Sequence, residues 1–96
     1  MPHVTVMPGV NILDNVILNI HAIVEHDCSV GSHTHIASGV YLAGNVRIGA
    51  CSHIGIESVI RQGINIDDNV VIGACEVVVK DVSSNLTVVG NPAINI

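Results

Sequence analysis

Residues 34–60 read THIASGVYLAGNVRIGACSHIGIESVI, and an aliphatic side chain stands at every sixth position of this stretch, from Ile36 to Ile60. The same period continues in both directions. The complete set is Val6, Ile12, Leu18, Val24, Val30, Ile36, Leu42, Ile48, Ile54, Ile60, Ile66, Ile72 and Val78. A fixed period is typical of stacked repeats and not of a conventional sheet or helical bundle.

A second set of small or aliphatic side chains lies two residues before the first set. Its members are Val10, Val16, Ala22, Cys28, Thr34, Val40, Val46, Ser52, Ser58, Ile64 and Val70. Inward side chains at alternate positions indicate strands, and the Gly, Asn, Asp and His residues between them indicate turns. Glu76 is the clear exception, because an unpaired carboxylate is costly to bury. An opening of the solenoid or a shift of register at Glu76 would accommodate it.

Each six-residue unit is therefore predicted to be a short strand followed by a corner. If three units make one turn of a triangular prism, residues 18 apart stack at about 4.8 Å, the spacing of hydrogen-bonded strands. The chain is predicted to be all-β, a single domain spanning residues 1–96 with roughly four coils. The pattern breaks after Val82, and a turn at Gly90–Ala93 follows, so residues 83–96 are expected to form a C-terminal flap.

The charge of the chain excludes one class of partner. It has 96 residues, only three lysines and arginines, and a formal net charge of −5. Fixed cations this sparse do not form the basic face that nucleic-acid binding requires. No signal peptide and no membrane-spanning segment is visible, and the three cysteines lack disulfide or metal spacing. All three cysteines are interpreted as structural, and a cytoplasmic location is expected.

Apolar side chains at outward positions predict self-association. They are Ile17, Ile23, Tyr41, Val59, Val71 and Val77. This is an unusual load of apolar side chains for solvent-exposed faces, and a homotrimer would bury them.

The candidate catalytic residues are His26, Asp27 and Gly44. Histidine is suited to proton removal near neutral pH, and a neighbouring carboxylate can orient its ring. Gly44 lies 18 residues after His26, at the same corner one coil later, where it would offer a backbone N–H to a developing oxyanion. Equally, Gly44 could be a corner glycine selected for a positive φ. His35 and His53 are also 18 apart and are expected to stack, pointing outward.

The order of several short motifs resembles one group of enzymes. The motifs are Val24–Cys28, Val30-Gly31, His35–Ala37, Ala43–Val46, Ile54–Ile56, Ile72–Ala74, Val79–Val82 and Val89–Ala93. They are similar to those of the sialic acid O-acetyltransferase and bacillosamine-type amino-sugar N-acetyltransferase family, which is built on a left-handed parallel β-helix. That family usually has an N-terminal Rossmann-like domain for its acceptor, and this chain is expected to lack it.

The resemblance implies a role for each matching residue. His26 would be the general base, Asp27 its support, and Gly44 the donor to the acetyl oxygen. His35 would contact acetyl-CoA, the donor substrate, and Ile56 and Ala74 would lie along its pantetheine arm, in clefts between subunits of a homotrimer. The acceptor would be an amine or hydroxyl of a small molecule, a sugar or nucleotide-sugar. From its stacking position His53 is a further ligand contact, while Lys80 and Arg61 are the cations available to the CoA phosphates.

Two other classes of function remain open. A trimeric scaffold or CoA-binding remnant without turnover would have the same repeats. A γ-carbonic-anhydrase-like centre would need three histidines around zinc. His21 and His26 are five residues apart, but they fall at corner positions of the wrong phase for that arrangement. No metal is expected.

Overall fold

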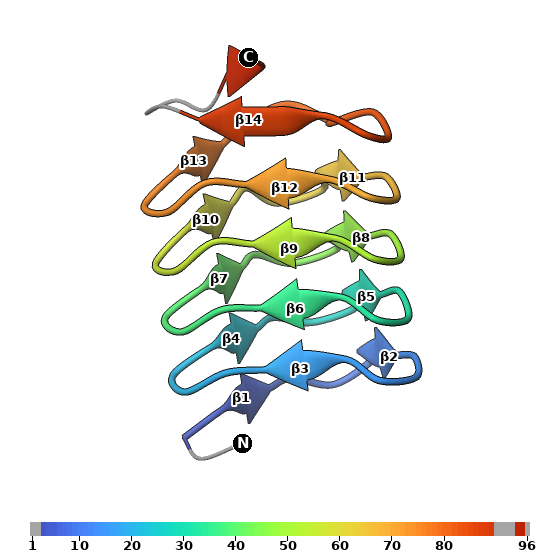
Figure 1. Cartoon of the computed structure of the whole chain (residues 1–96). Helices are drawn as coiled ribbons and strands as arrows, with labels where there is room; N and C mark the ends of the chain where they lie inside the picture. The colour runs from blue at the N-terminus through green and yellow to red at the C-terminus, as the bar shows by residue number, and fades with distance from the viewer. Residues whose placement is uncertain (1–2, 90–93, 96) are drawn as a thin grey trace.

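Three parallel sheets form the faces of a triangular solenoid in the computed structural model, which describes residues 3–89 and 94–95 (Figure 1). Sheet A contains β1 (Thr5–Val6), β4 (Ile23–Val24), β7 (Tyr41–Leu42), β10 (Val59–Ile60) and β13 (Val77–Val78). Sheet B contains β2 (Asn11–Ile12), β5 (Ser29–Val30), β8 (Arg47–Ile48) and β11 (Asn65–Ile66). Sheet C contains β3 (Ile17–Leu18), β6 (His35–Ile36), β9 (His53–Ile54), β12 (Val71–Ile72), β14 (Thr87–Val89) and β15 (Ile94–Asn95). The corners are named by the sheets they join: A/B, B/C and C/A.

The register between coils is 18 residues, as predicted. Ile23 pairs with Tyr41, and Tyr41 pairs with Val59. In Figure 1 the strands of sheet C are nearest the viewer and run from right to left, and the chain rises from β3 to β14. The rest of each coil, through sheets A and B, passes behind them. This winding is left-handed, the hand that the resemblance implied and the opposite of the usual parallel crossover.

The core is a narrow column of aliphatic side chains inside the prism. Every member of the six-residue series from Leu18 to Val78 is buried, whereas Val6 in the first coil is 46% exposed. The second set contributes Val40, Val46 and Val70 to the same core, together with the buried hydroxyls of Thr34, Ser52 and Ser58. Because inward residues occupy alternate positions, each strand exposes one side chain between two buried ones.

The corners owe their composition to backbone conformation. The third residue of each regular described corner has a positive φ, between 56° and 79°. Glycine reaches this left-handed region without steric cost, and Asn and Asp tolerate it better than other residues do. Cys51 and Cys75 occupy such positions and are exposed, whereas Cys28 is buried. The interpretation of all three as structural therefore fits only the buried Cys28.

The solenoid makes about five turns, one more than the expected four. The additional turn exists because the repeat continues past Val82 in a shortened coil. Ile66 pairs with Val82, and Val71 pairs with Thr87, so the spacing falls from 18 residues to 16. Strand β15 then pairs antiparallel with β14. The turn predicted at Gly90–Ala93 lies outside the described residues.

Glu76 is accommodated without a shift of register. Val59 still pairs with Val77 on the next position of the same coil, and the shortening comes later in the chain. Glu76 is 8% exposed, and its backbone N–H donates to the Ser58 hydroxyl at 3.2 Å. The solenoid therefore stays closed at this level.

Candidate active site

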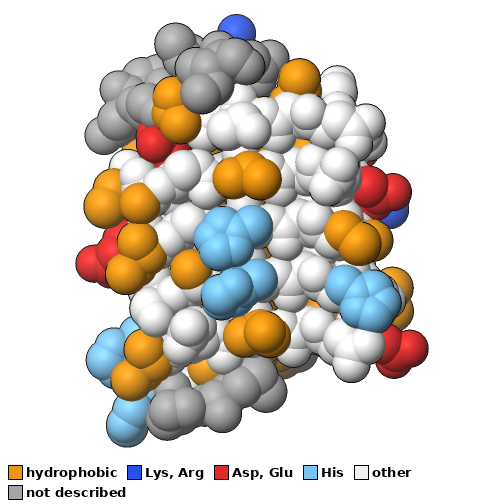
Figure 2. All heavy atoms as spheres, in the orientation of Figure 1, with side chains coloured by type: hydrophobic (Ala, Val, Ile, Leu, Met, Phe, Trp, Pro, Cys, Tyr) orange, Lys and Arg blue, Asp and Glu red, His pale blue; other side chains and the backbone are white. Residues whose placement is uncertain are grey.

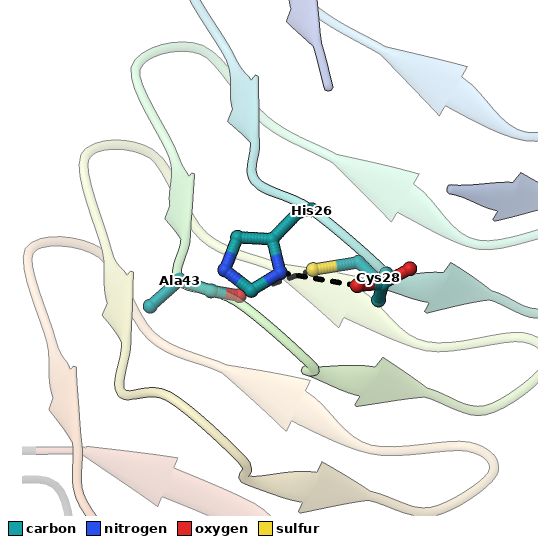
Figure 3. Close-up of polar contacts among 4 residues, drawn as sticks. His26, Cys28 and Ala43 are labelled. Carbon is teal, nitrogen blue, oxygen red and sulfur yellow. Dashed lines mark hydrogen bonds and ion pairs between the residues drawn. The ribbon is translucent and has the colours of Figure 1, made fainter. Parts of the chain in front are cut away.

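The predicted base lies at the A/B corner, between β4 and β5 (Figure 3). His26 Nδ1 is 3.2 Å from Asp27 Oδ2, and both side chains are exposed to solvent. If Nδ1 carries the proton and donates it to the carboxylate, Nε2 is left as the acceptor. This is the tautomer that a general base requires.

Gly44 lies directly against the imidazole of His26. A Cβ atom on Gly44 would stand 2.5 Å from His26 Nε2 and 2.7 Å from Cε1, closer than real contacts allow. Gly44 is not among the described residues with a positive φ; that conformation belongs to Asn45, with a φ of 60°. The alternative explanation, a glycine selected for its φ, is therefore wrong. The position needs glycine because the His26 ring fills the space of a side chain.

The backbone at this corner ties successive coils together. The Asp27 N–H donates to the Pro8 carbonyl at 3.1 Å, and the Asn45 N–H donates to the His26 carbonyl at 3.0 Å. For the Gly44 N–H, no acceptor is found in the described part of the chain. This donor therefore has its hydrogen-bonding capacity unused, and it belongs to the residue against which the His26 imidazole packs.

Two neighbours of the site were not found by sequence reasoning. Tyr41 donates its hydroxyl hydrogen to Glu25 Oε2 at 3.1 Å, and this hydrogen bond raises the pKa of Tyr41. Gly9, with a φ of 79°, lies so close beneath the Asp27 carboxylate that a side chain there would collide with it. The 18-residue stacking could have located Gly9, since it lies one coil before Asp27.

Cys28 does not take part in this constellation as a nucleophile. Its thiol points into the solenoid and donates to the Ala43 carbonyl at 3.1 Å (Figure 3). Burial raises the pKa of the Cys28 thiol, which disfavours the reactive thiolate.

The second group of predicted residues lies on another face. His35 and His53 pair in register on sheet C, and their ring centroids are 4.9 Å apart in an edge-on arrangement. The predicted stacking is confirmed. Figure 2 displays two histidines one above the other on this face, with hydrophobic side chains above and below them. His35 Nε2 is buried and has no hydrogen-bond partner among the described residues.

The remaining predicted contacts divide between two corners. Ile56 and Ala74 are exposed and stack at the C/A corner, next to the histidine pair. Lys80 and Arg61 are exposed at the A/B corner, on the coils beyond His26 and Gly44. One chain thus holds the base and the two cations at the A/B corner, and the histidine pair on sheet C beside the apolar Ile56 and Ala74 of the C/A corner.

Titration of His53 provides a first test of the histidine pair. Burial, together with the neighbouring His35, lowers the pKa of His53 below its ordinary value. We expect imidazole resonances to give a lower midpoint for His53 than the usual value of about 6.5, and to move it upward in His35→Asn. A midpoint unchanged by His35→Asn would contradict the coupling of the two rings.

The lowered pKa of His53 also determines how its contribution to the free energy of unfolding changes with pH. In the unfolded chain His53 binds its proton with an ordinary pKa, whereas the folded chain binds it less readily. The contribution of His53 to the free energy of unfolding is therefore present above about pH 6.5 and declines as the pH falls below this value. Urea unfolding between pH 5 and 8 should give a weaker pH dependence for His53→Gln than for the wild-type chain.

The described residues hold no cluster of three or more His, Cys, Asp or Glu side chains that could bind a metal ion. His21 and His26 lie at different corners, and the ring of His21 stacks with that of His3 instead, at 5.4 Å between centroids. The geometry gives no support to a zinc centre built on His21 and His26. Nor does any helix in the described part of the chain have the length and hydropathy needed to cross a membrane.

Solved structures with the same architecture include acyltransferases. The acetyltransferase domain of PglB from Neisseria gonorrhoeae is 40% identical, with a TM-score of 0.96 over 97% of this chain and 45% of that one. PerB from Caulobacter crescentus, solved with CoA and GDP-perosamine, is 28% identical, with a TM-score of 0.84 over 97% of this chain and 51% of that one. No family model matches the chain.

A curated relative agrees with the structural matches. The acyl-[acyl-carrier-protein]–UDP-N-acetylglucosamine O-acyltransferase of Helicobacter pylori is 39% identical over 80 residues, which are 83% of this chain and 30% of that protein. The chain is a hexapeptide-repeat β-helix, and these matches show that it is similar to acyltransferases. Its particular likeness is to the PglB acetyltransferase domain, also solved with acetyl coenzyme A, and the predicted resemblance to this group is confirmed. The chain spans less than half the length of these two proteins.

Proposed function

We propose that the chain is an acetyl-CoA-dependent acetyltransferase that modifies an amine or hydroxyl of a small acceptor of the sugar or nucleotide-sugar class. The observation that carries this proposal is the arrangement of three residues at the A/B corner. There Asp27 orients His26 from one side, and Gly44 leaves room for the ring on the other. The similarity to a PglB acetyltransferase domain solved with acetyl coenzyme A, and to PerB solved with CoA and GDP-perosamine, supports the donor and the acceptor class.

In the proposed mechanism the acceptor gives its proton to His26 Nε2 and attacks the thioester carbonyl directly. The Gly44 N–H donates to the oxygen that becomes negative, since a fixed donor at about 2.7–3.1 Å stabilises an oxyanion. The tetrahedral intermediate then expels CoA as a thiolate, which takes the proton held by the imidazolium. The reaction forms one acetyl ester or amide and breaks one thioester. No acyl-enzyme is needed, which agrees with the buried Cys28 thiol.

The outward side chains of the three sheets support a homotrimer. Sheet A presents Thr5, Ile23, Tyr41, Val59 and Val77, and sheet B presents Asn11, Ser29, Arg47 and Asn65. Sheet C mixes apolar residues with the two histidines. Burying the apolar sheet A against other copies would leave the polar sheet B in water. We propose that this association brings the A/B corner of one copy next to sheet C of another.

This assembly would complete the donor site. Within one chain His26 lies at the A/B corner and His35 lies on sheet C, so the two groups are on different parts of the prism. In the trimer, His35 and His53 would contact acetyl-CoA, with its pantetheine arm along Ile56 and Ala74. Lys80 and Arg61 would be available to its phosphates.

Calorimetric titration of acetyl-CoA into the purified chain tests the proposal, with CoA alone titrated alongside. We expect saturable binding that is about tenfold weaker in His35→Ala, the loss of roughly one hydrogen bond to ligand (about 1.4 kcal/mol). His33→Asn, on an exposed histidine at the B/C corner with a φ of 63°, is the matched control and should bind as the wild type does. Absence of binding at millimolar acetyl-CoA would contradict the proposal and leave a structural scaffold.

A further inference from the structure

A hollow that the proposed chemistry does not use lies on sheet B, toward the B/C corner. Its volume is about 330 Å³. The strands contribute Asn11, Ser29 and Arg47, and the corner contributes Leu13, Ser32 and Asp68. This volume is at the lower end of the range found for small-molecule sites, about 300–1,000 Å³.

Arg47 gives the hollow a positive charge in a chain that is otherwise acidic. The sequence has only three lysines and arginines, and the other two, Arg61 and Lys80, are at the A/B corner. Arg47 is exposed and forms no ion pair with any other residue that the structure describes. A guanidinium without a carboxylate partner keeps its planar set of donors free for a phosphate or carboxylate.

Neutral hydrogen-bonding groups stand beside this cation. Ser29 pairs in register with Arg47, and Asn11 pairs with Ser29, so the three side chains lie one above another on adjacent strands. The Ser29 hydroxyl and the Asn11 amide have no hydrogen-bond partner in residues 3–89 and 94–95. Adjacent strands are about 4.8 Å apart, close enough for neighbouring groups to contact a single anion.

One carboxylate also borders the hollow. Asp68 accepts a hydrogen bond from the Ala50 N–H through Oδ1, at 2.8 Å. This contact holds the Asp68 carboxylate at the corner. Its charge repels an anion at that end of the hollow and leaves the strand row of Asn11, Ser29 and Arg47 as the favourable end.

We propose that the hollow on sheet B is a phosphate-binding site, with Arg47 as its cation and Ser29 and Asn11 as hydrogen-bond donors. A phosphate presents several charged acceptor oxygens, which match a guanidinium flanked by a hydroxyl and an amide. Ser29 follows His26 by three residues, so their Cα atoms are at most about 11 Å apart. A phosphorylated acceptor held on this row would therefore extend toward the A/B corner. The phosphate-binding site itself does not depend on the proposed transfer reaction.

Binding of inorganic pyrophosphate, followed by amide chemical shifts on the full chain, tests the site. We expect the largest shifts on sheet B near the B/C corner. Arg47→Gln should weaken binding about tenfold or more, and Ser29→Ala by a smaller factor. His33→Asn changes an exposed side chain at the B/C corner that does not line the hollow, and it should change binding less than about twofold. Arg47 and His33 are both exposed, so neither substitution should change the thermal midpoint substantially.

Two further titrations identify the source of the phosphate. If Arg47→Gln weakens the binding of a nucleoside diphosphate sugar and leaves the binding of acetyl-CoA unchanged, the site belongs to the acceptor. If Arg47→Gln instead removes the difference in affinity between CoA and dephospho-CoA, the site belongs to the donor. Pyrophosphate binding that is equal in Arg47→Gln and wild type, or weakened equally by His33→Asn, would overturn the proposal. Because these measurements need no turnover, their failure is distinct from a failure of the acetyltransferase proposal.

Discussion

Replacing His26 by alanine is expected to lower the turnover of acetyl transfer by about 10²–10⁴-fold, the range that general-base catalysis contributes. The substitution removes the only group at the A/B corner that we propose accepts the proton of the acceptor. The side chain is about half exposed and packs outside the core, so the fold should persist. Acetyl-CoA binding should change little, because His26 is not among the proposed donor contacts. Steady-state kinetics with a panel of amino-sugars would measure the loss.

A matched histidine control separates this role from surface effects. His21 is exposed at a C/A corner with a φ of 61°, and asparagine tolerates that conformation. His21→Asn should therefore keep wild-type turnover. Wild-type turnover in His26→Ala would contradict the assignment of the base, and a comparable loss in His21→Asn would show that the loss is not specific to His26.

A single methyl group at Gly44 should be nearly as damaging. The new Cβ in Gly44→Ala would occupy the space of His26 Nε2 and Cε1, so the imidazole must turn away. A displacement of about 1 Å at a catalytic group can cost about 10²-fold in rate, and we expect a loss of that order. The fold should be retained, because Gly44 is not in the left-handed region that penalises a side chain. Imidazole chemical shifts of His26 would report the displacement independently of activity.

Gly63 provides the opposite control at the same corner. It has a φ of 77° and nothing within 4 Å of an added Cβ. Gly63→Ala should therefore lower the free energy of unfolding by about 1–2 kcal/mol, the cost of a side chain in the left-handed region. It should leave turnover unchanged. If Gly44→Ala gave unaltered His26 shifts and full activity, the packing argument would be wrong.

The period of the sequence was sufficient to predict a solenoid of stacked three-sided coils, whereas its left hand was implied only by the family resemblance. A two-residue strand with one outward and one inward side chain leaves little freedom, so the 18-residue stacking also located Gly44 against His26 and His35 against His53. The count of coils was too low, because the pattern was followed only to the point where its period changed. Thr87 pairs with Val71 at a spacing of 16, and a search for a period of six does not find such a pair.

Details of side-chain packing were less accessible from the sequence. Spacing places Gly44 and His26 at one corner, but it does not distinguish a glycine needed for φ from one needed for space. That distinction depends on the rotamer of His26. The hollow around Arg47 was also missed, since its outline depends on how corners of successive coils lie beside strands and not on any motif.

The last described coil of the solenoid is a poor template for further parallel coils. Each parallel coil presents free backbone groups to the next, and this is a template on which a second molecule could polymerise. At the C-terminal end, the shortened coil and the antiparallel β15 break both the 18-residue register and the strand direction. A second chain cannot extend sheet C there as a continuous parallel stack. The change of spacing that concealed the fifth coil thus also acts against fibre formation from this end of the molecule.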